Sequence, residues 1–280
     1  MQSLNSTTVD SWIHQLLQNQ RLTAAETSQL CASAKDLFTT EANLISLPAS
    51  CPLTIIGDLH GQFEDLKTLL QLAGPPSPTN HLVFLGDYVN RGPDSVAVLS
   101  LCLAYKVRYP TQVTMLRGNH ESDAICKVYG LYEECQSKFD GDSTYNSFIE
   151  VFNSLPLGVV VEEKVLCLHG GLSPAFKTLD EIQAVDRFGP VAHTGGMTDL
   201  LWADPNPEGS GFEDSPRGAG WIFGQGASET FMEANGLTLL IRAHQLKATG
   251  SGWDHDQKVL TLFSAPNYCS TSANQAAFAT

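Results

Sequence analysis

The stretch Leu82-Val83-Phe84-Leu85-Gly86-Asp87-Tyr88-Val89-Asn90-Arg91-Gly92 decides the fold of this chain. Its first four residues are apolar and include a β-branched and an aromatic side chain, which predicts a buried strand. The glycines around Asp87 mark the point where the strand ends and the backbone turns. A carboxylate and an arginine therefore follow the carboxyl end of this strand.

Two further apolar runs end in the same way. Residues 53–56 lead into Gly57-Asp58-Leu59-His60-Gly61, and residues 113–116 lead into Arg117-Gly118-Asn119-His120-Glu121. Segments with helical spacing separate the three runs, so we expect a β-α-β-α-β unit with parallel strands. Ligands bind beyond the carboxyl ends of parallel strands, and the polar residues there are expected to converge.

Helices are expected on both sides of these strands. Two N-terminal helices are indicated, and Thr23 and Glu26 form a capping box at the start of the second. A helix follows each of the first two strands. In the second of these helices, one buried face would be formed by Val96, Leu99, Leu103 and Val107. Residues 122–155 are expected to be mostly helical.

The second half of the chain predicts another sheet. Residues 157–161 and 165–168 flank Glu162-Glu163-Lys164 as a hairpin, and further strands are expected at 237–241 and 259–263. The glycine-rich segment 195–226 is expected to be an ordered loop that carries function. The fold class is therefore α/β with antiparallel additions (α+β), and one domain is expected over residues 1–280.

Composition excludes several classes of protein. The net charge of −14 argues against a nucleic-acid-binding surface, which neutralises phosphates with clustered Lys and Arg. No apolar run approaches the ~18 residues of a membrane span, the first residues lack the pattern of a signal peptide, and we expect no membrane partner. The odd number of cysteines, without a Cys-x-x-Cys pair, favours reduced and mostly buried thiols and a cytoplasmic or nuclear location. The cysteines are Cys31, Cys51, Cys102, Cys126, Cys135, Cys167 and Cys269.

Six residues with nitrogen or oxygen donors follow expected strands, and none of them is a thiolate. They are Asp58, His60, Asp87, Asn119, His169 and His244. Such donors suit Mn, Fe or Zn in a catalytic site rather than a structural zinc finger. Six ligands exceed what one catalytic ion with an open position can use, so we predict two divalent ions that share Asp87. Two such ions lower the pKa of a shared water and neutralise the oxygens of a phosphoryl group.

Phosphate ester hydrolysis needs further groups, which the sequence also offers. Arg91 and Arg217 are candidates to bind phosphoryl oxygens through their guanidinium forks. His120, next to Asn119, is placed to protonate the leaving oxygen. Taken singly, each motif is typical of a turn, of a histidine with satisfied hydrogen bonds or of a surface ion pair. Their ordered occurrence in one chain favours the dinuclear site.

The motifs resemble the successive signatures of the PPP-family serine/threonine protein phosphatases over nearly the whole chain. In order, they are Gly57-Asp58-Leu59-His60-Gly61, Gly86-Asp87-Tyr88-Val89-Asn90-Arg91-Gly92, Arg117-Gly118-Asn119-His120-Glu121, His169-Gly170-Gly171, Arg242-Ala243-His244 and Ser264-Ala265-Pro266-Asn267-Tyr268-Cys269. Three segments look most like the type 2A catalytic subunit and its type 4 and type 6 relatives. They are Ser215-Pro216-Arg217-Gly218-Ala219-Gly220, Asn235-Gly236-Leu237 and Ala243-His244-Gln245-Leu246.

The resemblance implies a fold, an activity and a set of roles. The fold would be a metallophosphoesterase-type central β-sandwich flanked by helices, and the substrates phosphoserine and phosphothreonine in proteins. One metal would be held by Asp58, His60 and Asp87, and the other by Asp87, Asn119, His169 and His244. Phosphate would be bound by Arg91, Asn119 and Arg217, with His120 as general acid and Tyr268 beside the groove. Regulatory or scaffold subunits would be partners.

Three departures from the family pattern change these expectations. Asn90 replaces an aspartate that orients the catalytic histidine in the family. An asparagine oxygen can accept the same hydrogen bond from His120 but supplies no charge. We therefore expect slower turnover with intact substrate binding. Residues 270–274 read Ser-Thr-Ser-Ala-Asn where type 2A members have Tyr-Arg-Cys-Gly-Asn, which alters a loop beside the groove. The sequence ends at Thr280 without the family's further strand and Tyr-Phe-Leu tail. The family's usual holoenzyme is therefore not assumed for this chain, and we expect an unpaired sheet edge that costs stability.

Two alternatives stay open from the sequence. Asn90 and the absent tail motivate a catalytically weakened phosphoprotein-binding or regulatory subunit. A metallophosphoesterase for small phosphodiesters or nucleotides would use the same metals. The setting of Arg217 and the long C-terminal half favour protein substrates over small molecules.

Overall fold

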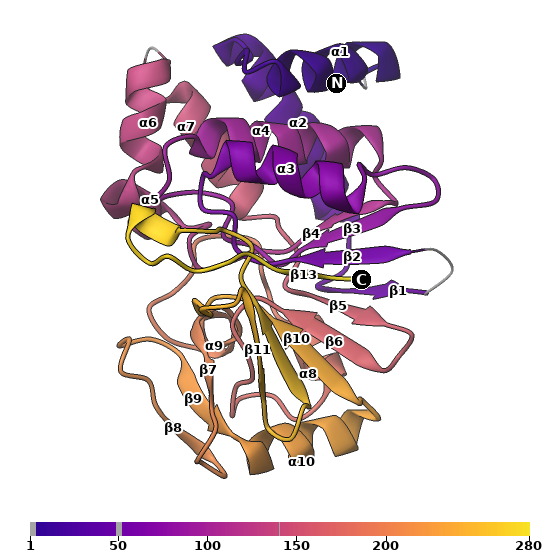
Figure 1. Cartoon of the computed structure of the whole chain (residues 1–280), viewed down its shortest axis with the longest axis vertical. Helices are drawn as coiled ribbons and strands as arrows, with labels where there is room; N and C mark the ends of the chain where they lie inside the picture. The colour runs from indigo at the N-terminus through magenta and orange to yellow at the C-terminus, as the bar shows by residue number, and fades with distance from the viewer. Residues whose placement is uncertain (1–3, 49–51, 140) are drawn as a thin grey trace.

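The computed structural model describes residues 4–48, 52–139 and 141–280. Two β-sheets lie in the middle of the molecule and helices cover their outer faces (Figure 1), as the resemblance implied. The four-stranded sheet has the order β13 (Phe278–Ala279), β2 (Leu53–Ile56), β3 (His81–Phe84), β4 (Val113–Met115). The six-stranded sheet has the order β1 (Leu44–Leu47), β5 (Gly158–Val161), β6 (Val165–Leu168), β10 (Leu239–Arg242), β12 (Val259–Leu262), β11 (Ser251–Asp254).

The β-α-β-α-β prediction is confirmed in the four-stranded sheet. Strands β2, β3 and β4 pair in parallel, with Ile56 opposite Phe84 and Phe84 opposite Met115. The expectation of an unpaired sheet edge is wrong at the carboxyl end of β2, just before Asp58. There, β13 pairs antiparallel with Ile55 and Ile56.

The predicted hairpin is also confirmed. Strands β5 and β6 pair antiparallel, and Glu162 and Glu163 take up the left-handed turn between them with φ angles of 49° and 57°. Strand β6 continues in parallel with β10, and β10 in parallel with β12. The sequence pattern missed the edge strands β1 and β11, which are short and only partly buried.

The glycine-rich segment 195–226 is more regular than expected. It contains helix α9 (Gly196–Trp202) and a third sheet with the order β7 (Asp204–Asn206), β9 (Trp221–Gly224), β8 (Phe212–Asp214). Strands of three or four residues carry too few alternating positions to be read from sequence. The loop prediction is therefore wrong for much of this segment.

The helices form two groups around the sheets. Most lie over the four-stranded sheet: α1 (Ser6–Leu17), α2 (Ala24–Thr40), α3 (Phe63–Ala73), α4 (Ser95–Arg108), α5 (Asp123–Tyr129), α6 (Leu131–Lys138) and α7 (Ser143–Phe152). The capping box of Thr23 and Glu26 is present at the start of α2. Helix α4 is buried on nearly all sides rather than on one face, because Val98, Leu101 and Ala104 are buried as well.

The remaining helical elements belong to the second half of the sequence. They are α8 (Leu179–Gln183), α9, α10 (Gln225–Asn235) and the short 3₁₀ helix η1 (Tyr268–Ser270). No helix in the described ranges is long and apolar enough to span a membrane.

An apolar core between the two sheets fixes their relative position. It joins Ile55 and Val83 of the four-stranded sheet to Val159, Cys167 and Ile241 of the six-stranded sheet. At one end of this core, a parallel bridge between Asp58 and Phe263 links the two sheets directly. The carboxyl ends of strands from both sheets therefore meet at one place.

The cysteines agree with the expectation of mostly buried thiols. Cys31, Cys102, Cys126, Cys135 and Cys167 are buried and free, and Cys269 is free and exposed. Burial raises the pKa of the Cys167 thiol to about 12, so it is protonated at neutral pH. Cys51 lies outside the described residues.

Candidate metal centre

The polar residues that follow five strands converge on one centre. Asp58 and His60 follow β2, Asp87 follows β3, Asn119 follows β4, His169 follows β6 and His244 follows β10. Two groups of donor atoms can be defined in which all the atoms of a group lie within 4.8 Å of one another. The first group comes from His60, Asp87 and His120, and the second from Asp87, His169 and His244. Asp87 belongs to both groups, as the predicted bridging ligand must.

The two oxygens of Asp87 face different histidines. Its Oδ2 lies 3.6 Å from Nε2 of His60, and its Oδ1 lies 3.4 Å from Nε2 of His169. Asp58 Oδ2 lies 3.5 Å from Nε2 of His60, and Asn119 Oδ1 lies 3.0 Å from Nε2 of His169. One carboxylate thus stands between two separate sets of nitrogen and oxygen donors, which is the arrangement of a dinuclear site.

The outer nitrogens of two histidines are already occupied. Nδ1 of His60 lies 3.1 Å from the Val89 carbonyl oxygen, and Nδ1 of His169 lies 2.9 Å from that of Leu85. A carbonyl oxygen can only accept, so each Nδ1 carries the proton and donates it. The lone pair of each ring is left on Nε2, which faces the centre, as in histidines that bind metals.

Two buried atoms at the centre have no hydrogen-bond partner among the described residues: Oδ2 of Asp58 and Nε2 of His244. Buried polar atoms are nearly always satisfied, so orphaned ones call for an explanation. Both are metal-donor atoms that belong to the predicted ligand set. Divalent cations would satisfy them, and the residues present therefore fit the predicted metals.

Electrostatics at the centre also favour a cation. Burial raises the pKa of Asp87 well above its usual range, and the neighbouring carboxylates of Asp58 and Glu121 raise it further. Burial lowers the pKa of His169 to about 4 and that of His244 well below its usual value. The imidazoles are therefore neutral, as metal ligands must be, and a positive ion would offset the buried carboxylates.

Glu121, which sequence reasoning missed as a site residue, holds the Asp87 loop in place. Its fully buried carboxylate accepts from the backbone N–H groups of Asp87, Tyr88 and Gly118 at 2.7, 2.9 and 2.9 Å. The carboxylate connects the turn after β3 with the turn after β4. In the sequence, this role of Glu121 is indicated only by its position directly after Gly118-Asn119-His120.

Replacing Gly118 with alanine is expected to displace the bridging carboxylate. A Cβ at this position would overlap Oδ1 and the backbone N of Asp87 and approach the Glu121 carboxylate. Overpacking of this kind costs about 1–3 kcal/mol and moves the backbone. Metal content and melting temperature would be measured beside Gly211→Ala, where a Cβ meets open space. An alanine variant that binds as much metal as the parent would contradict the expectation.

His120 is close to the first group of donors, but its hydrogen bonds make it a proton donor. Nδ2 of Asn90 lies 3.0 Å from its Nδ1, while Oδ1 of Asn90 accepts from the backbone N–H of Leu131 at 3.0 Å. The Leu131 N–H fixes the direction of the amide, so Asn90 donates to His120. The expectation that the Asn90 oxygen accepts this bond is wrong. The ring proton of neutral His120 then lies on Nε2, which cannot bind a metal.

The other predicted site residues surround the centre. The Arg91 guanidinium stacks on the ring of Tyr129 at 3.8 Å, and that ring lies 5.5 Å from the ring of His120. The Tyr268 ring lies 4.9 Å from that of His60. Arg217 forms an ion pair with Asp204. Burial lowers the pKa of His244 most, His169 comes second, and the charge of Arg217 lowers it further. The roles assigned to these residues remain predictions.

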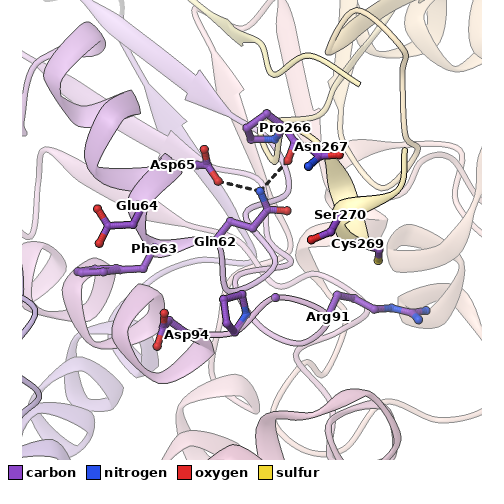
Figure 2. A pocket seen from close by; sticks show the side chains of 12 residues that line it. Gln62, Phe63, Glu64, Asp65, Arg91, Asp94, Pro266, Asn267, Cys269 and Ser270 are labelled. Carbon is purple, nitrogen blue, oxygen red and sulfur yellow. Dashed lines mark hydrogen bonds between the residues drawn. The ribbon is translucent and has the colours of Figure 1, made fainter. Parts of the chain in front are cut away.

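A cavity of about 450 Å³ adjoins Arg91 (Figure 2). In its wall, Nε2 of Gln62 donates to Asp65 Oδ2 and to the Pro266 carbonyl oxygen, both at 2.8 Å. Ser270, from the loop that departs from the family pattern, also lines it. Of the predicted site residues, Arg91 is the one that lines this cavity.

Known proteins resemble this chain in family and in fold. Residues 51–248 match the model of the calcineurin-like phosphoesterases. The chain resembles a protein serine/threonine phosphatase from Saccharomyces cerevisiae with similarity to human phosphatase PP5, at 32% identity and a TM-score of 0.92, over 98% of this chain and 88% of that one. A cold-active protein-tyrosine phosphatase of a Shewanella species shares the fold, at 17% identity and a TM-score of 0.58, over 84% of this chain and 77% of that one.

Proposed function

Because the chain belongs to the calcineurin-like phosphoesterase family and is a phosphatase, we propose that its substrates are phosphoserine and phosphothreonine residues of proteins. One observation carries this proposal. The Asp87 carboxylate is common to both groups of donor atoms and lies near residues predicted to bind phosphate. The chain that holds it resembles a protein serine/threonine phosphatase over 98% of its length. Metal-dependent hydrolysis of phosphate esters is the chemistry that such a site supports.

The side chains at the centre have complementary tasks in this reaction. Divalent cations held by Asp58, His60, Asp87, Asn119, His169 and His244 would supply an activated water and neutralise phosphoryl charge. Arg91 and Arg217 bind the equatorial oxygens of the phosphoryl group. His120 donates its Nε2 proton to the leaving oxygen of the serine or threonine side chain.

Several finer assignments belong to the proposal. The segments around Arg217, Gly236 and His244 support a type 2A-like member of the PPP family. The mixed nitrogen and oxygen donor set suits Mn, or Fe with Zn. The cavity beside Arg91 would take residues that flank the phosphorylated side chain, which supports a polypeptide substrate over a nucleotide. Regulatory subunits and a cytoplasmic or nuclear location are proposed on the resemblance and the cysteines alone.

Asn90 is proposed to slow the reaction without preventing it. Its amide donates to His120, so protonation of Nδ1 would place two donors face to face. The histidine therefore gives up a proton from a neutral ring, which makes it a weaker acid than an imidazolium. The metal ligands and the two arginines do not depend on this bond, so substrate binding is retained.

Hydrolysis of a phosphothreonine peptide in the presence of Mn²⁺ tests the proposed substrate class. We expect turnover of this peptide at a higher kcat/KM than that of a nucleotide phosphodiester. A faster reaction with the phosphodiester would identify a small-molecule esterase instead. Metal-dependent binding of the peptide without turnover would identify a phosphoprotein-binding subunit.

A further inference from the structure

Arg217 lies on a segment that does not by itself fix the side chain. The residue stands between β8 and β9, close to Gly218 and Gly220, whose φ angles of 79° and 68° are in the left-handed region. Its side chain is 34% exposed. A long exposed side chain on such a turn has many conformations, and one must be selected if it is to bind phosphate.

Asp204, the first residue of β7, selects that conformation. Nε of Arg217 donates to Oδ2 of Asp204 at 2.5 Å, and Asp204 is only 3% exposed. A guanidinium has five N–H donors in a fixed plane, and this bond uses the one on Nε. The ion pair thus restricts the plane of the group and does not use its terminal nitrogens, which stay available to bind a phosphate.

Arg242 in turn holds Asp204. This arginine at the end of β10 is fully buried, and its Nη2 donates to Oδ1 of Asp204 at 3.0 Å. Its Nε donates to the carbonyl oxygen of Gly170 at 2.6 Å, and its Nη1 to Oε1 of Gln245 at 3.0 Å. Gly170 and Gln245 directly follow the proposed ligands His169 and His244. Arg242 therefore joins both histidine segments to Asp204.

We propose that Asp204 is a positioning residue for the phosphatase reaction: Arg242 anchors it, and it orients Arg217 toward the phosphoryl group. The inference rests on the proposed role of Arg217 and deepens it. Asp204 acts through Arg217 and does not touch the substrate. A single buried carboxylate between two guanidiniums also couples the placement of Arg217 to the segments that carry His169 and His244.

A double-mutant cycle with Asp204→Asn and Arg217→Ala tests the inference, with a small aryl phosphate as substrate. In the parent background, Asp204→Asn is expected to lower kcat/KM by about 10- to 100-fold, the loss expected for one charge-assisted hydrogen bond. The inhibition constant of inorganic phosphate should rise by a similar factor, with metal content unchanged. In the Arg217→Ala background, the same change should have no more than about a 2-fold effect.

Asp10→Asn is the control, because Asp10 also accepts from the Nε of an arginine, Arg108, at 2.7 Å, but on the surface of α1 and α4. It should leave activity unchanged. Equal losses from Asp204→Asn in both backgrounds, or an Arg217→Ala variant as active as the parent, would overturn the inference.

The cycle can be repeated with Asp204→Glu, which keeps the charge beside Arg242, if the asparagine variant does not fold. Aryl phosphate turnover without phosphopeptide turnover would refute the proposed substrate and leave the cycle interpretable.

Discussion

Asp87→Asn is expected to lower turnover by at least about 10³-fold, because both cations would lose their shared carboxylate and metals supply several kcal/mol of transition-state stabilisation. The change is nearly isosteric. An asparagine oxygen can still accept the bond that the backbone N–H of His120 donates to Oδ1 of Asp87 at 2.9 Å. The loss would therefore come from the metal site and not from the fold. Metal content and hydrolysis of a phosphothreonine peptide are the measurements.

The stability of the same variant provides an internal check. Burial and Asp58 hold the pKa of Asp87 well above its usual range, so the folded metal-free protein binds a proton more tightly there than the unfolded chain. Stability from this group is present below the unfolded pKa and is lost as the pH rises through the folded pKa. At neutral pH without metal, Asp87→Asn should thus melt no lower than the parent, and adding Mn²⁺ should stabilise only the parent.

Asp36→Asn, on the exposed face of α2, is the matched control and should change neither metal content nor rate. If the parent turned over the peptide and Asp87→Asn did so equally fast, the dinuclear mechanism would be excluded. If neither protein turned over the peptide above background while the parent bound metals and peptide, the binding-subunit alternative would be supported instead.

Asn90→Asp is expected to raise kcat by about 10- to 10³-fold, within the range of general acid–base catalysis. One carboxylate oxygen would still accept from the Leu131 N–H. The other would replace the amide nitrogen and accept a hydrogen bond from the Nδ1–H of His120. The ring could then hold a proton on each nitrogen and act as an imidazolium acid. KM should change little, because the arginines and metal ligands are untouched.

The size of the gain should depend on the leaving group. Threonine and serine oxygens leave poorly and need a proton, whereas a phenolic oxygen needs less help, so the gain should be larger for a phosphothreonine than for a phosphotyrosine peptide. Asn146→Asp adds the same charge to the exposed surface of α7 and should have no effect on either substrate. Equal kcat values of parent and Asn90→Asp on phosphothreonine would refute the proposed role of Asn90.

The local pattern of the sequence was sufficient for much of the fold and for the polar residues that the fold brings together at the strand ends. Apolar runs that end in Asp, His and Asn predicted the parallel strands β2, β3 and β4 and the residues that follow them. This works because a buried strand and the turn that ends it involve only residues close in sequence. Strands as short as β7 to β9 give no such signal, and the segment that contains them was predicted to be a loop.

Only the tertiary structure decided how these residues act on one another. The direction of the Asn90 amide depends on Leu131, which lies 41 residues away, and the backbone of His244 donates to Asp58 across 186 residues. The anchoring of Arg217 through Asp204 and Arg242 likewise joins the turn between β8 and β9 to the start of β7 and the end of β10. Hydrogen bonds of this kind leave no periodic trace in the sequence, because they form only after the packing of two sheets has brought distant segments together.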